Sequence, residues 1–173
     1  MKTIGFVGGA LLISSAALGQ SLGEKTGINS AFGIAPTTQD FVTEAAMGGM
    51  FEVESSKLAI QKSEGAVKVF ATQMVADHTK ANAELATEAN AETLSVPDAL
   101  DASNQDKVDK LQKLNGADFS KQYVAYQVSA HKDAVSLFER YGKGGDNAKL
   151  KALAVTTLPT LQHHLDMAQA LDK

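Results

Sequence analysis

The chain of 173 residues contains no cysteine, no tryptophan and only three prolines. The absence of cysteine excludes disulfide bonds, thiolate metal sites, a thiol nucleophile and a lipid-anchored N-terminus. The formal net charge of −4 argues against a nucleic-acid partner or an anionic-membrane surface. The sequence also lacks a Gly-rich phosphate loop, a His-Glu-x-x-His motif and a Gly-x-Ser-x-Gly motif, so no common catalytic signature identifies a reaction.

The N-terminus is typical of an export signal. Lys2 precedes an apolar run from Ile4 to Leu18, and small residues at 17–19 favour cleavage after Gly19. This run is shorter than the ~20 residues that a membrane-spanning helix needs. Residues 1–19 are therefore predicted to be a signal peptide, and the mature protein is predicted to be periplasmic, without an integral membrane segment. An uncleaved N-terminal anchor in the membrane is the alternative.

The rest of the chain is predicted to be one all-α domain. Residues 20–36 are rich in Gly, Ser, Asn and Thr without a hydrophobic period, which indicates a flexible leader before the domain at 37–173. Apolar residues at helical spacing predict four long helices. These run from Thr37 or Thr38 to about Ser63, from Val67 to Glu92, from Ala117 to Tyr141, and from a cap at Asp146 through Ala168.

A short, charged helix from Ser103 to Leu114 is predicted between the second and third long helices. The turns after Ser63 and Tyr141 are tight, so each pair of long helices is expected to be an antiparallel hairpin. We therefore predict an up-down-up-down four-helix bundle with one short extra helix. Pro159 is expected to kink the last helix or to mark a second start within it.

Histidines occupy helix faces that are otherwise apolar. His78 continues a stripe that includes Phe70 and Met74, and His131 lies between Val128 and Val135. A buried imidazole needs a polar partner, because an unpaired polar group in a protein core is costly. The partner of each could be a metal ion, a carboxylate or a backbone carbonyl.

Hairpin geometry suggests which residues meet. A turn near residue 65 places Glu52 opposite His78, and both turns at one end of the bundle would bring Asp77 and His131 to the same level. Mirroring about residue 144 places residue 157 opposite His131, so His164 is expected about 10 Å out of register along the axis. His163 is expected to point into solvent.

Carboxylates and imidazoles that converge in a bundle core are typical of metal sites. The predicted ligands are Glu52, His78, His131 and His164, with Glu54 and Asp77 as alternates or as partners that orient an imidazole. Such a set suits a divalent transition metal, namely Zn, Ni, Cu or Fe. A purely structural polar layer is the competing interpretation.

Several motifs together resemble a known family. They are Phe51-Glu52-Val53-Glu54, the run from Val69 to His78, Val128-x-x-His131, and Leu158-Pro159-x-Leu161-x-x-His164. In this combination the chain resembles a bacterial family of exported ferritin-like bundles, domain of unknown function 4142, often labelled as outer membrane proteins. The resemblance implies a ferritin-like four-helix fold and an envelope location, but no established activity.

The chain departs from di-iron relatives of that fold, which use a Glu-x-x-His motif on each of two helices. Val75 and Leu161 stand where those glutamates would be, so a carboxylate-bridged di-iron site is not expected. Our leading hypothesis is an exported, non-enzymatic bundle that binds a divalent metal. The alternatives are a metal-dependent redox enzyme of the envelope, or a metal-free structural or interaction protein that docks through the charged helix.

Overall fold

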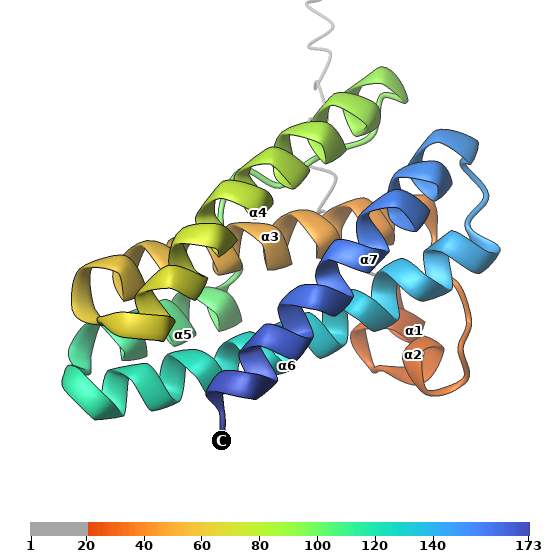
Figure 1. Cartoon of the computed structure of the whole chain (residues 1–173). Helices are drawn as coiled ribbons and strands as arrows, with labels where there is room; N and C mark the ends of the chain where they lie inside the picture. Colours follow the sequence, from red (N-terminus) through yellow and green to blue (C-terminus); the bar gives the residue numbers. More distant parts are fainter. Residues whose placement is uncertain (1–20) are drawn as a thin grey trace, which may run out of the picture.

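The computed structural model of the chain describes residues 21–173, and these residues are all-helical, without a strand. The four long helices are α3 (Thr38–Lys62), α4 (Gly65–Ala91), α6 (Gly116–Gly144) and α7 (Ala148–Leu171), as Figure 1 shows. Three shorter helices are α1 (Leu22–Lys25), α2 (Ile28–Ala31) and α5 (Ala102–Lys113). The predicted all-α class is confirmed. The predicted signal peptide lies outside the described residues.

The four long helices and α5 begin within two residues of their predicted starts, and side-chain caps fix the starts of α3, α5 and α7. Thr37 accepts a hydrogen bond at 3.1 Å from the backbone N–H three residues later. Asp101 caps α5, which was predicted to start at Ser103, and Asn147 rather than the predicted Asp146 caps α7. In each case the capping oxygen belongs to the residue just before the first helical turn, where it reaches free N–H groups.

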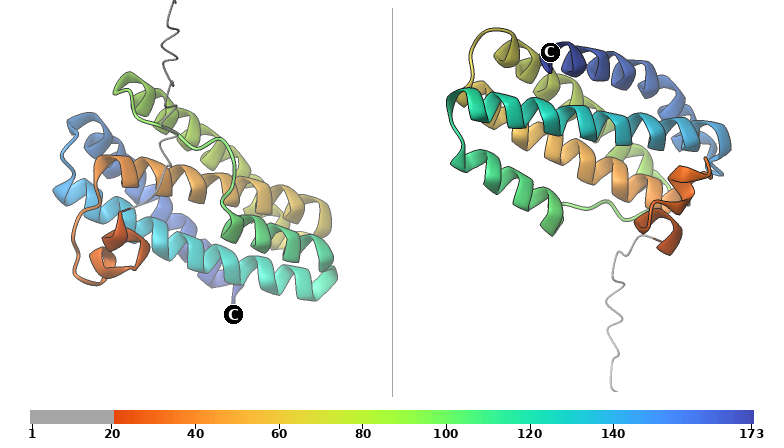
Figure 2. Two further views of the ribbon diagram at one scale, coloured as in Figure 1. Left: turned by 180° about the vertical axis from the view of Figure 1, so that it is seen from behind. Right: turned by 90° about the horizontal axis from the view of Figure 1, so that it is seen from below.

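The two helical hairpins point in opposite directions. α3 turns into α4 at one end of the bundle, whereas α6 turns into α7 at the other end (Figure 1). The predicted up-down-up-down order is therefore wrong, because α4 and α6 run in the same direction. The connection between them, which includes α5, returns along the length of the bundle (Figure 2).

The length of this connection makes the return possible. A 27-residue helix such as α4 is ~41 Å long. The extended residues 92–101 can span about 33 Å, and the 12 residues of α5 add about 18 Å. The short helix predicted in this connection is therefore part of a crossover, and it packs against α3 and α6.

The apolar core is divided into two clusters, one toward each end of the bundle. The first gathers the start of α3, the end of α4, the end of α6 and the start of α7, and includes Phe41, Leu85, Tyr141 and Leu150. The second gathers the opposite ends of the same helices with α5, and includes Ala59, Phe70, Leu111, Phe119 and Ala168. The polar residues of the candidate site come from the helix segments between these clusters.

The segment before α3 is attached to the bundle by a buried ion pair. Composition predicted residues 20–36 to be a flexible leader, whereas residues 22–25 and 28–31 are helical in the structure. The buried carboxylate of Glu24 pairs with the guanidinium of Arg140 on α6. Arg140 also donates to the carbonyl of Ile34 at 2.7 Å. This pairing joins residues far apart in the sequence, so local composition does not reveal it.

Two further features concern single helices. α7 continues through Pro159 as one helix, without the second start that was considered. Across the described part of the chain, no helix combines the length and the apolar character that crossing a bilayer requires.

Candidate metal centre

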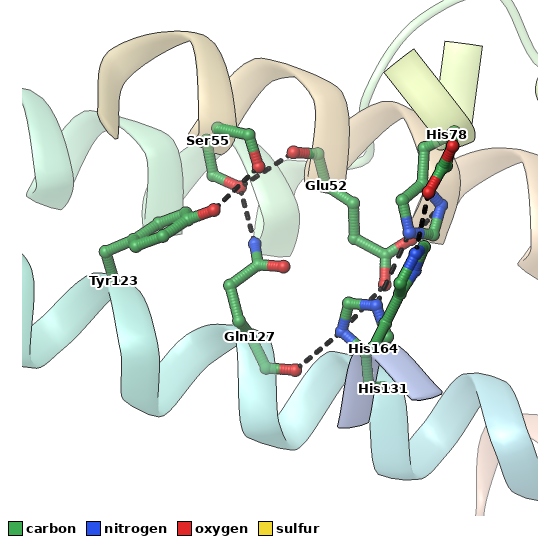
Figure 3. Close-up of polar contacts among 9 residues, drawn as sticks. Glu52, Ser55, His78, Tyr123, Gln127, His131 and His164 are labelled. Atoms are coloured by element: carbon green, nitrogen blue, oxygen red, sulfur yellow. Dashed lines mark hydrogen bonds and ion pairs between the residues drawn. The ribbon is translucent and has the colours of Figure 1, made fainter. Parts of the chain in front are cut away.

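Three buried histidines from three helices meet between the two apolar clusters of the core. Figure 3 shows the three side chains together. His78 comes from α4, His131 from α6 and His164 from α7, and their exposed fractions are 4%, 0% and 1%. The ring centroids of His78 lie 5.4 Å from His131 and 5.3 Å from His164, and the latter two are 5.5 Å apart. The three imidazoles therefore form a nearly equilateral triangle.

One nitrogen of each ring is bound to an acceptor behind it. His131 Nδ1 lies 2.9 Å from the carbonyl oxygen of Gln127, which can only accept, so this nitrogen carries a hydrogen. His78 Nδ1 lies 2.9 Å from Glu52 Oε2, and His164 Nε2 lies 2.9 Å from Asp77 Oδ2. Outer acceptors of this kind fix the tautomer and orientation of metal-binding imidazoles.

The opposite nitrogen of each ring is left for the cluster itself. Nε2 of His78 and Nε2 of His131 are 3.4 Å apart. Nδ1 of His164 is buried and has no hydrogen-bond partner. One nitrogen from each histidine lies within 4.8 Å of those of the other two. Two zinc–nitrogen bonds at the tetrahedral angle would place their nitrogens ~3.3–3.4 Å apart, which matches the spacing of His78 and His131.

The protons in this cluster are distributed unequally. Burial alone would raise the pKa of Glu52, but the positive charge of His78 and a hydrogen bond from His78 lower it. Burial would lower the pKa of His78, but the Glu52 carboxylate raises it. We therefore assign an ion pair between Glu52 and His78 to the metal-free site at neutral pH.

The other two histidines are neutral in that state. Burial lowers the pKa of His131, despite the opposing charge of Glu52. Burial and the charge of His78 lower the pKa of His164 to about 4. The single extra proton thus lies on His78, and His78 Nε2–H donates to the lone pair of His131 Nε2.

A second layer of polar contacts continues from this site toward the α3–α4 turn (Figure 3). Gln127 Nε2 donates to Ser55 Oγ at 3.0 Å, and the hydroxyls of Ser56 and Tyr123 are 2.8 Å apart. All four side chains are fully buried. The sequence analysis missed them, although Tyr123, Gln127 and His131 follow one another at four-residue spacing on one face of α6.

Sequence mirroring was right about Glu52 and His78 and wrong about His164. The expected offset of about 10 Å is absent, because His164 packs directly against His131. α6 ends at Gly144 and α7 begins at Ala148, so the turn centres near residue 146, and residue 161 mirrors His131. His164 is then less than one turn further along α7.

The direction in which helical side chains point accounts for the remaining offset of three residues between residue 161 and His164. Side chains lean toward the N-terminus of their own helix. His131 therefore leans away from the α6–α7 turn, and His164 leans toward it, so they meet when His164 starts three residues further out. The same three-residue offset separates His78 from the mirror position of Glu52 in the α3–α4 hairpin, whose turn centres between residues 63 and 64.

The prediction that these residues meet assumed that both hairpin turns lie at the same end of the bundle. The turns lie at opposite ends, and the cluster nevertheless forms. His78 and His131 lie at or beside the middle of helices of 27 and 29 residues, so the height of each is almost the same when measured from either end.

The remaining predicted site residues take different positions. Glu52 lies at the Nδ1 side of His78, with its Oε1 3.5 Å from His131 Nδ1, rather than beside the free Nε2 atoms. Glu54 faces solvent, where it pairs with Lys57 at 2.7 Å, and is not part of the cluster. Asp77 is partly exposed and reaches the cluster through His164. His163 is exposed, as expected.

These features define a class of protein: a helical bundle with a crossover connection and a buried cluster of three histidines. The chain belongs to the family described as domain of unknown function DUF4142, whose sequence profile matches residues 23–171. No curated protein matches the chain.

Among solved structures, the fold is similar to the crystal structure of a DUF305 fragment from Deinococcus radiodurans. The TM-score is 0.68 and the sequence identity is 11%, and the match covers 79% of this chain and 97% of that one. At this identity the similarity concerns the fold alone.

Proposed function

We propose that this protein is an exported ferritin-like bundle that binds one divalent transition-metal ion through His78, His131 and His164. The observation that carries the proposal is the division of roles between the ring nitrogens. Each imidazole has one nitrogen bound to an outer acceptor, while the other is reserved for the cluster. In a purely structural layer, each imidazole would also need an outer acceptor. Such a layer has no need for three further ring nitrogens that face one another and share a single proton.

The chemistry of the donors restricts the ion. Three neutral imidazoles suit Zn, Ni, Cu or Fe, whereas Mg and Ca prefer oxygen ligands. Three protein ligands leave a fourth position open, where a bound ion would act as a Lewis acid toward a small ligand. Glu52 and Asp77 would act from behind the imidazoles, and we assign no reaction to the site.

The fold supports the ferritin-like part of the proposal. A single long crossover between two antiparallel hairpins is the connectivity of ferritin-like bundles, and such bundles build metal sites from side chains on facing helices. Here the carboxylates that would bridge two irons are replaced by Val75 and Leu161, so the site suits one ion. The export part rests on the sequence of residues 1–19 alone.

The direct test is metal content. The protein is purified without a polyhistidine or other metal-binding tag. It is dialysed against Zn²⁺ and then against metal-free buffer, and the zinc that remains bound is measured by mass spectrometry. We expect about one ion per chain, and its loss in the His78→Ala, His131→Ala and His164→Ala variants.

His163→Ala is the matched control, because this exposed histidine is the sequence neighbour of His164 and should leave the zinc content unchanged. A wild-type protein that retains none of Zn²⁺, Ni²⁺, Cu²⁺ or Fe²⁺ would contradict the proposal. The histidines would then be a structural polar layer, and their variants would change only the stability.

A further inference from the structure

A cavity of about 380 Å³ lies beside the histidine cluster. It is lined mainly by residues of α3 to α7, with one residue each from α1 and α2, and the buried residues Glu52 and His78 are part of this lining. Its lining also includes the exposed residues Asp101, Ser103 and Asp133, so it connects the cluster with solvent. His131 and His164 do not line it.

The charged groups along this cavity are mainly acidic. Of the three basic residues in its lining, Arg140 is paired with Glu24 and His78 with Glu52, which leaves Lys107. The lining also holds the acidic residues Glu44, Asp101 and Asp133, which form no ion pair with any residue of the described range 21–173. A cleft lined by charges of one sign concentrates ions of the opposite sign.

The pKa of Glu44 reflects the negative charge of the groups around the cavity. Burial and the neighbouring charges of Glu24, Asp40 and Asp133 raise its pKa to about 7, against the opposing charge of Arg140. Carboxylates that share a site in this way are relieved by a cation.

The inner end of the cavity offers an independent sign of a missing ligand. Glu52 lines the cavity, and its buried Oε1 accepts no hydrogen bond from the described residues, although it lies 3.5 Å from His131 Nδ1. Buried polar atoms without partners are rare in proteins, and one beside three histidines suggests that a polar or charged species occupies the space.

We propose that this cavity is the route by which a hydrated divalent cation enters the histidine cluster, and that Glu44 and Asp133 draw the cation in from solvent. This inference rests on the proposed metal-binding function and adds to it the path and the residues that control the rate of uptake. His131 and His164 are too deeply buried to receive an ion directly from solvent. The cation reaches Glu52 and His78 first and is then bound by all three imidazoles.

The test is the rate of Co²⁺ uptake by the full folded chain, followed by stopped-flow absorbance of the cobalt band at low ionic strength. Neutralising the lining with Glu44→Gln and Asp133→Asn together should lower the association rate constant on the order of 3- to 30-fold, and added salt should reduce the difference. Lys107→Met should raise the rate constant instead. Glu54→Gln is the control, since Glu54 faces solvent and does not line the cavity.

A second variant tests the path without changing a charge. Gly48 lines the cavity, and a Cβ added there would meet no atom within 4 Å. Gly48→Leu should therefore fill the route and slow both uptake and release at least several-fold, with little change in the equilibrium dissociation constant for Co²⁺. Ala76→Leu, on an exposed face of α4, is the matched control.

Unchanged uptake rates in both the charge variants and Gly48→Leu, with normal Co²⁺ affinity, would overturn the access route and leave the metal site in place. A wild-type chain that takes up no Co²⁺ or other divalent transition ion would overturn both proposals. Slower uptake in Gly48→Leu with unchanged affinity supports the route even if the double charge variant fails to fold.

Discussion

Replacing Glu52 by Gln tests whether this residue orients and polarises the imidazoles from behind or binds the metal ion itself. The amide keeps the shape of the side chain and can still accept the hydrogen bond from His78 Nδ1, but it lacks the negative charge. Glu52 lies 2.9 Å from one imidazole of the cluster and 3.5 Å from another. Loss of an outer partner typically costs 10- to 100-fold in metal affinity, and contact with two rings places Glu52→Gln near ~100-fold, or about 2.7 kcal/mol.

The size of this effect should depend on pH. The Glu52 carboxylate raises the pKa of His78, so in the wild-type protein the metal must displace a proton from His78 as the pH falls. In Glu52→Gln that proton is held less tightly, and competition from it is weaker. We therefore expect the ratio of wild-type to variant affinity to be larger at pH 8 than at pH 6.

The assay is a competition titration for Zn²⁺ against a chromophoric chelator at both pH values, with His131→Ala and His163→Ala measured in parallel. Affinity lost in Glu52→Gln as completely as in His131→Ala would show that Glu52 binds the ion directly. An unchanged affinity at both pH values would refute the argument that its charge tunes the imidazoles.

Three further outcomes follow from the structure. The low pKa of His164, about 4 against the ordinary 6.5, means that the unfolded chain binds this proton first, so metal-free protein should lose up to ~3 kcal/mol of stability as the pH falls from 6.5 to 4. Urea unfolding should show a smaller loss in His164→Asn. The pKa of His78 is raised, so its contribution to stability is already complete below pH 6.5 and does not alter this comparison. Tyr123→Phe removes the hydrogen bond with Ser56, which should cost ~1 kcal/mol in urea unfolding without changing the zinc content. Arg140→Met leaves Glu24 without its partner, so hydrogen exchange of residues 22–34 should become faster while that of α3–α7 is unchanged.

Much of the local structure could be predicted because it depends on local signals. Helical periodicity located the long helices, and a single tight turn was enough to pair Glu52 with His78. These features depend on residues that are neighbours in the sequence or that face each other across one short turn.

What could not be predicted depends on how distant segments are arranged. Nothing in the composition of residues 92–115 shows whether that connection turns back at one end or returns along the bundle. Predicting that His164 lies beside His131 would have required two facts: the residue at which the α6–α7 turn is centred, and the direction in which the His164 side chain points. The pairing of Glu24 with Arg140 was equally inaccessible, because it joins residues separated by more than a hundred positions.

The division of the three histidines between the hairpins bears on when an ion could bind under our proposal. The α3–α4 hairpin contributes His78 with its partner Glu52, and the α6–α7 hairpin contributes His131 and His164. Neither half alone presents three nitrogens, so a chain exported in the unfolded state would carry no complete site during translocation. The compartment in which the two hairpins dock would then decide which ion the protein receives.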